Sequence, residues 1–130
     1  MSDQTAKILV IDDDNSMLEL TRINLEKLGF KVATTKNAQT GVELYKQQLD
    51  SEQAFDIVII DLRLGGMQHG TGVATELLEL HPDAKLIVSS GDSSNPAMVN
   101  FSEYGFKARL EKDFNRERMK NTIQQVLSTT

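Results

Sequence analysis

The sequence predicts an α/β protein with a doubly wound, five-stranded parallel sheet and helices on both faces. Five short apolar segments alternate along the chain with five segments whose apolar residues recur at helical spacing. This alternation is typical of right-handed βαβ crossovers. No linker, internal repeat or low-complexity segment divides the 130 residues. We therefore expect a single domain over residues 1–130, with a core from about residue 6 to residue 128.

The five apolar segments predict the strands. Runs of Ile, Leu and Val without polar alternation are typical of strands buried on both faces of a parallel sheet. The clearest run, residues 57–60, ends abruptly at Asp61. The predicted strands are Lys7–Ile11, Phe30–Thr35, Phe55–Asp61, Leu86–Val88 and a weaker one at Arg109–Leu110 that ends by Lys112.

Residues that start or stop helices bound the intervening segments. Asp or Asn precedes three of them, Pro96 suits the first turn of a fourth, and glycine follows two. The glycine-rich stretch Gly65–Gly72 lacks the lysine of a P-loop, so we predict a flexible loop there. The predicted helices are Ser16–Leu28, a helix from Asn37 that ends within Gln47–Gln53, Val73–Leu80, Pro96–Tyr104 and Asn115–Leu127.

Composition and charge exclude several classes of function. The net charge of −5 argues against general nucleic-acid binding, which needs a basic face. No stretch approaches the roughly 20 apolar residues of a membrane span, and the N-terminus has no signal segment. The absence of cysteine excludes disulfides and thiolate chemistry and fits a reducing compartment. We therefore expect a soluble cytoplasmic domain without nucleic-acid or membrane partners.

The polar residues that end the strands indicate a functional site. Because the carboxyl ends of parallel strands share one edge of the sheet, side chains from distant parts of the sequence meet there. Taken singly, each of these residues also fits an ordinary role as a helix cap, turn residue or solvated side chain. The joint placement favours a site formed by Asp12, Asp13, Asp14, Asp61, Ser89, Ser90 and Lys112.

Carboxylates gathered in one cleft repel one another unless a cation lies among them. Mg²⁺ prefers oxygen ligands and commonly binds carboxylates together with phosphate oxygens, so the acidic edge predicts a magnesium site. A carboxylate such as Asp61 can act as a nucleophile toward phosphorus and form an aspartyl phosphate. Lys112 and the metal would neutralise charge on the transferring group, and the Ser89 hydroxyl would hydrogen-bond a phosphoryl oxygen.

These motifs resemble the receiver domain of two-component response regulators, over essentially the whole chain. The resemblance implies a flavodoxin-like (βα)5 fold and a signalling domain that catalyses its own phosphorylation and dephosphorylation rather than a conventional turnover enzyme. It makes Asp61 the phospho-acceptor, Ser89 the hydroxyl switch, and Asp61 and Lys112 the catalytic pair. The metal ligands that it implies are Asp12, Asp13, Asp61 and the backbone carbonyl of Arg63.

The resemblance also implies partners. A histidine kinase or histidine phosphotransfer domain would donate the phosphoryl group, and a downstream effector or linked output domain would receive the signal. Three segments are most similar to receivers of hybrid sensor histidine kinases: Ser89–Ser93, Pro96–Met98 and Tyr104–Phe106.

Three positions depart from the family pattern. Asp113 follows Lys112 where a cis-proline is usual, Arg109 stands where an aromatic residue often lies, and Gly65 begins a lengthened loop where proline is common. Two other functions stay open on the sequence: a phosphorylation-independent receiver fold that only docks partners, and a haloacid-dehalogenase-like phosphatase. The second would use an Asp-x-Asp motif formed by Asp12 and Asp14.

Overall fold

The computed structural model describes residues 6–64, 69–113 and 115–128. Over these residues strands and helices alternate strictly, as the sequence predicts. A short 3-10 helix, η1, follows α4. The elements are β1 (Lys7–Ile11), α1 (Asn15–Lys27), β2 (Lys31–Thr35), α2 (Ala38–Gln48), β3 (Ile57–Asp61), α3 (Gly70–Leu80), β4 (Leu86–Ser90), α4 (Pro96–Val99), η1 (Phe101–Tyr104), β5 (Ala108–Glu111) and α5 (Arg116–Leu127).

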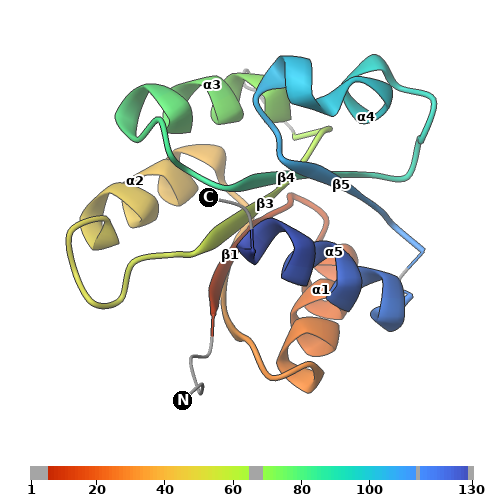
Figure 1. Ribbon diagram of the computed structural model, residues 1–130, viewed down its shortest axis with the longest axis horizontal. Helices are drawn as coiled ribbons and strands as arrows, with labels where there is room; N and C mark the ends of the chain where they lie inside the picture. Colours follow the sequence, from red (N-terminus) through yellow and green to blue (C-terminus); the bar gives the residue numbers. More distant parts are fainter. Residues whose placement is uncertain (1–5, 65–68, 114, 129–130) are drawn as a thin grey trace.

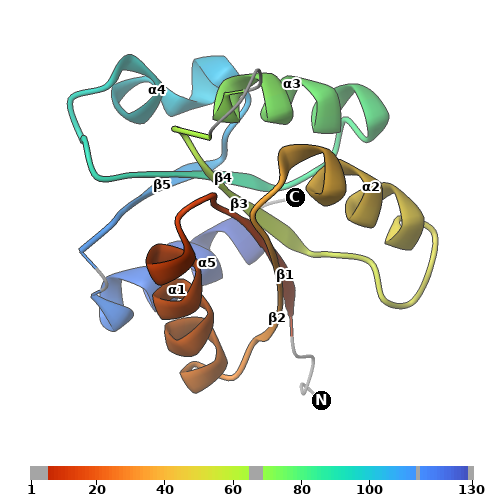
Figure 2. The same cartoon turned by 180° about the vertical axis from the view of Figure 1, so that it is seen from behind.

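The five strands form one parallel sheet in the order β2-β1-β3-β4-β5. Helices α2, α3 and α4 cover one face, and α1 and α5 cover the other (Figures 1 and 2). The predicted doubly wound, flavodoxin-like (βα)5 architecture is therefore confirmed. It brings the carboxyl ends of β1, β3, β4 and β5 to one edge.

Strand alternation divides the core into two layers. All five residues of β3 are buried, because this central strand has helices on both of its faces. Val58 and Ile60 pack in the layer beneath α2, α3 and α4, whereas Ile57 and Ile59 pack with α1 and α5. The successive side chains of each strand thus point to opposite layers.

Asp and Asn side chains cap four of the described helices: Asn95 caps α4, and the other three caps are those that the sequence indicates. Asp14 accepts hydrogen bonds from the amides of Ser16 and Met17 at the start of α1. Asn37 accepts from Thr40 at α2, and Asn115 accepts from Arg118 at α5. These bonds satisfy amides that a helix N-terminus otherwise leaves without an intrahelical partner.

Helix α3 begins earlier than predicted. Residues 65–68 of the glycine-rich stretch lie outside the described residues, but Gly70-Thr71-Gly72 forms the first turn of α3 rather than a loop. The reason is a close approach of two backbones: a Cβ on Gly70 would lie 2.4 Å from the carbonyl oxygen of Asp61. Glycine there lets α3 start directly against the end of β3.

The predicted helix Pro96–Tyr104 is instead broken into α4 and η1. Asn100, between the two, has non-helical backbone angles (φ −117°, ψ 50°). The carbonyl of Met98 would accept from the amide of Ser102 in a continuous α-helix. It accepts instead from Arg109 Nη1, at 3.2 Å.

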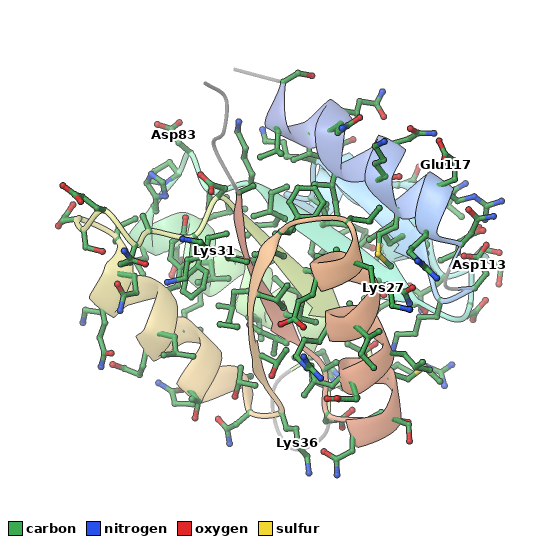
Figure 3. All side chains as sticks on the ribbon, turned by 90° about the horizontal axis from the view of Figure 1, so that it is seen from below. Lys27, Lys31, Lys36, Asp83, Asp113 and Glu117 are labelled. Atoms are coloured by element: carbon green, nitrogen blue, oxygen red, sulfur yellow. The ribbon has the colours of Figure 1, made fainter. Side chains whose placement is uncertain are left out.

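Charged side chains lie on the outside of the helical layers. Lys27 of α1, Lys36 after β2 and Glu117 of α5 all point away from the sheet (Figure 3). Among the described helices, none combines the length and the apolar character that crossing a membrane requires.

Candidate phosphoryl and metal site

Strand alternation brings three charged side chains onto the same layer. Ile8 and Val10 of β1, Ile57 and Ile59 of β3, and Leu110 of β5 all pack in the layer formed with α1 and α5. Two residues beyond the last of these in each strand are Asp12, Asp61 and Lys112. The period of two that buries the apolar residues therefore also directs the three charged groups toward each other.

Lys112 lies between two buried carboxylates. Its Nζ is 2.9 Å from Asp12 Oδ2 and 3.1 Å from Asp61 Oδ1. The Asp12 and Asp61 residues are only 3% and 5% exposed, so solvent screens these contacts much less than it screens a surface ion pair. The lysine offsets part of the repulsion between the two acids.

Backbone amides hold both acids in place. Asp12 Oδ1 accepts from the amide of Asp14 at 3.0 Å, and Asp61 Oδ1 accepts from the amide of Arg63 at 3.3 Å. Asp14 itself caps α1. The second acid of the hypothetical Asp-x-Asp phosphatase motif therefore has a structural role as a helix cap.

The environment favours the neutral form of Asp61. Burial, followed by the negative charge of Asp12, raises the pKa of Asp61 to about 6, although Lys112 and the Arg63 amide oppose this rise. For Lys112, burial favours the neutral amine, but the hydrogen bonds and negative charges of Asp12 and Asp61 outweigh it and raise its pKa. The site therefore holds a charged lysine beside an acid whose ionisation is costly.

A pocket of about 580 Å³ opens over this edge of the sheet, and we call it the acidic pocket. Its described lining includes neither Asp12 nor Ser89. Asp12 is buried and contacts the lining residue Lys112. The lining residues are Asp13, Asp14, Asp61, Arg63, Ser90, Gly91, Asp92 and Lys112.

The structure places Ser90, rather than the predicted Ser89, at the pocket. Strand β4 continues through Ser90, two residues beyond the predicted end. Ser89 is the register partner of Asp61 within the sheet, and Ser90 lies one residue further along at the edge. The buried Ser90 hydroxyl oxygen accepts from the amide of Asp92 at 3.0 Å. Ser90, and not Ser89, is therefore among the described residues that line the acidic pocket.

Three acids could hold a metal ion. Carboxylate oxygens of Asp12, Asp13 and Asp61 all lie within 4.8 Å of one another. The donor set is entirely oxygen, which suits a hard divalent cation such as Mg²⁺ or Ca²⁺ better than a soft one. Asp12 and Asp61 are buried and Asp13 is exposed, so the cluster is reachable from solvent.

Two residues that depart from the family pattern, Arg109 and Asp113, lie in β5 and just after it. The Lys112–Asp113 peptide bond is trans, as are the other peptide bonds of the described residues. Arg109 connects β5 with α4 through its hydrogen bond to the Met98 carbonyl. Sequence reasoning identified Arg109 as unusual but did not foresee this contact, because it depends on where α4 lies over the sheet.

The chain belongs to the response regulator receiver domain family, whose model matches residues 8–124. This is a family of signalling domains rather than of conventional enzymes. Among curated proteins, the chain is 26% identical over 127 residues to the transcriptional regulatory protein GlrR of Escherichia coli. It is 29% identical over 128 residues to the C4-dicarboxylate transport transcriptional regulatory protein DctD of Pseudomonas aeruginosa.

Both relatives are transcriptional regulatory proteins. The matches cover 98% and 96% of this chain but only 27% and 26% of the relatives, so the chain spans about a quarter of their length. The predicted closeness to receivers of hybrid sensor kinases stays a prediction.

Solved structures agree on the fold. A CheY-like receiver domain protein from Methanospirillum hungatei superposes with a TM-score of 0.80 at 26% identity, over 95% of this chain and 94% of that one. A receiver domain protein from Clostridium thermocellum gives 0.82 at 24% identity, over 94% of each chain. The second likeness bears on the fold alone.

Proposed function

We propose that Asp61 is the phospho-acceptor of a two-component phosphorelay. A carboxylate oxygen of Asp61 attacks the phosphorus of a phosphohistidine on a histidine kinase or histidine phosphotransfer domain. The P–N bond breaks, and its electron pair stays on the imidazole nitrogen, which takes a proton from solvent. The observation that carries this proposal is the Asp12–Lys112–Asp61 contact beside the third acid, Asp13.

The surrounding residues divide the remaining tasks. Asp12, Asp13 and Asp61 would hold Mg²⁺ together with the Arg63 carbonyl, and the bound ion supplies positive charge to the phosphoryl oxygens. Lys112 donates to the phosphoryl group from its position between the acids. Ser90 is our candidate for the hydroxyl that hydrogen-bonds the phosphoryl group after transfer, in place of Ser89. In this proposal the domain itself, with Asp61 and Lys112 as catalytic residues, supplies much of the catalysis.

Phosphorylation would shift the domain between two conformations. A phosphoryl group adds about −1.5 to −2 charges by analogy with phosphoserine, and it favours one state only through contacts that differ between the two. Ser90 and Lys112 provide such contacts. The output would be binding of a downstream effector or a linked output domain, in the cytoplasm, with residues 1–130 acting as one receiver unit.

The experiment is phosphorylation by acetyl phosphate with Mg²⁺, read on a phosphate-affinity gel. The Asp61→Asn variant should lose labelling, and EDTA should abolish labelling of the unsubstituted protein. Asp56→Asn is the matched control, because Asp56 accepts from the Lys7 amide beside the opposite end of β3 and should label normally. Equal labelling of the Asp61→Asn and unsubstituted proteins would refute the proposal. An amide NMR spectrum unchanged by beryllofluoride and Mg²⁺ would favour phosphorylation-independent docking.

A further inference from the structure

A second concave surface lies apart from the acidic pocket, between α3 and η1. Both views of the fold place α3 beside the segment that contains α4 and η1 (Figures 1 and 2), and α3 packs against η1. The cavity between them measures about 620 Å³. We call it the α3–η1 groove. Six of its lining residues carry the argument: Thr71, Thr75, Leu78, Glu79, Glu103 and Tyr104.

The groove presents apolar surface to solvent. Tyr104 is 39% exposed and is one of few large apolar side chains on the described surface. Leu78 is half-buried at the base of the groove, where a Cβ on Gly105 would lie 2.3 Å from Leu78 Cδ1. Glycine at position 105, with a φ of +92°, therefore lets η1 approach α3 closely while leaving the leucine accessible.

Several polar groups in and beside the groove already have partners within the chain. The Thr75 hydroxyl donates to the Thr71 carbonyl at 3.1 Å. At the end of η1, the carbonyls of Phe101 and Ser102 accept from the amides of Phe106 and Gly105, respectively. Recognition at this surface would therefore depend on apolar contact and charge more than on specific hydrogen bonds.

The charge of the groove is of one sign. Glu79 and Glu103 are both exposed, and the described lining contains no Lys, Arg or His. This arrangement repels phosphate groups, nucleic acids and anionic lipid surfaces, and attracts cationic side chains. A second copy of this chain is disfavoured as occupant because each copy carries a net charge of −5.

We propose that the α3–η1 groove docks a peptide segment of a partner protein in which apolar anchor residues are flanked by lysine or arginine. The anchors would pack against Leu78 and Tyr104, and the cationic flanks would lie near Glu79 and Glu103. This mode is an apolar contact with a charged rim. It does not require phosphorylation of Asp61, so the proposed function and this inference stand or fall separately.

The test is an amide NMR titration of the ¹⁵N-labelled protein with a defined octapeptide, Lys-Lys-Ser-Leu-Leu-Ser-Lys-Lys, blocked at both ends. Saturable shifts should appear at residues 71–79 and 103–105. Replacing both leucines by serine, or all lysines by glutamate, should abolish them. Absence of saturable binding at millimolar peptide, or shifts centred elsewhere, would overturn the proposal. Shifts of these amides with protein concentration alone would also overturn it, because they would identify a second copy as the occupant.

Variants separate specific docking from general attraction to an acidic protein. Tyr104→Ala should weaken binding about tenfold, since it removes an apolar wall. The double variant Glu79→Gln and Glu103→Gln should weaken it about fivefold, as expected for two exposed charge pairs. Glu43→Gln with Glu117→Gln makes the same charge change at exposed positions on α2 and α5 and should leave the affinity unchanged. Equal weakening by the two double variants would refute a specific site.

Discussion

The acidic pocket and the α3–η1 groove have similar volumes, about 580 and 620 Å³, and both carry carboxylates. They differ in how those charges are arranged. In the pocket, buried acids converge on one lysine within 3.1 Å. In the groove, two exposed acids border apolar side chains. Convergent acids suit a small cation and a phosphoryl group, whereas acids beside apolar surface suit a larger cationic partner.

The largest expected effect on the free energy of unfolding comes from removing the positive charge of Lys112 from the acidic pocket. Lys112→Met in metal-free buffer at pH 7 should lower the free energy of unfolding by about 4 kcal/mol, because it leaves two buried carboxylates without their counter-charge. Urea unfolding followed by far-UV circular dichroism measures this. Lys120→Met, at an exposed position of α5, is the matched control and should have little effect. A loss no larger than that of the control would mean that water screens the pocket as it screens the groove.

The second effect is a pH dependence of the free energy of unfolding, which the acidic pocket should produce and the groove should not. The pKa of Asp61 rises from an ordinary 3.8 to about 6 in the folded state, so folding favours the protonated acid. The resulting stabilisation is complete below pH 3.8 and is lost as the pH rises through about 6. Without metal, the free energy of unfolding of the unsubstituted protein should therefore fall by about 3 kcal/mol, relative to that of Asp61→Asn, between pH 3.5 and pH 7.

Parallel urea unfolding series of the two proteins give this difference at each pH. Mg²⁺ should reduce it, because a bound cation favours the ionised acid. A constant difference between the two proteins across this range would show that Asp61 ionises as a solvated acid does.

The smallest effect concerns α3, which lines the groove and begins against the backbone of Asp61. Gly70→Ala should lower the free energy of unfolding by about 2 kcal/mol, because the new methyl group would overlap the Asp61 carbonyl. Gly72→Ala, two residues later at an exposed position of α3, should instead raise it by about 0.5 kcal/mol through helix propensity. Thermal unfolding of both variants measures the contrast. Similar changes in the free energy of unfolding for the two variants would show that the start of α3 does not pack closely against the end of β3.

Most of the acidic pocket could be predicted from the sequence, because strand ends, alternation and parallel topology are local patterns. Asp12, Asp61 and Lys112 were assigned to the site in this way, and the structure brings their side chains together. The sequence did not indicate that Ser90 lines the pocket in preference to Ser89, since two adjacent serines give no signal for where a strand ends. Asp92 at the pocket rim was missed because it follows the strand end in an irregular segment.

The groove could not be predicted from the sequence. Thr71, Leu78 and Glu103 show no shared pattern, and they come together only through the packing of η1 on α3. That packing depends on the break at Asn100, where the sequence suggested one continuous helix. Glycine at position 70 likewise suggested a loop, because helix propensity does not report how closely another backbone segment packs against a helix.

Strands β1, β3 and β5 direct their charged residues toward the same layer, and this limits where residues can be inserted or deleted. Asp12, Asp61 and Lys112 each follow a buried residue of the same layer by two positions. Deleting one residue inside any of these strands would turn its charged group toward the opposite layer, even if every remaining residue stayed apolar. Insertions and deletions should therefore be tolerated in the connections between the strands and helices, and rejected within these three strands.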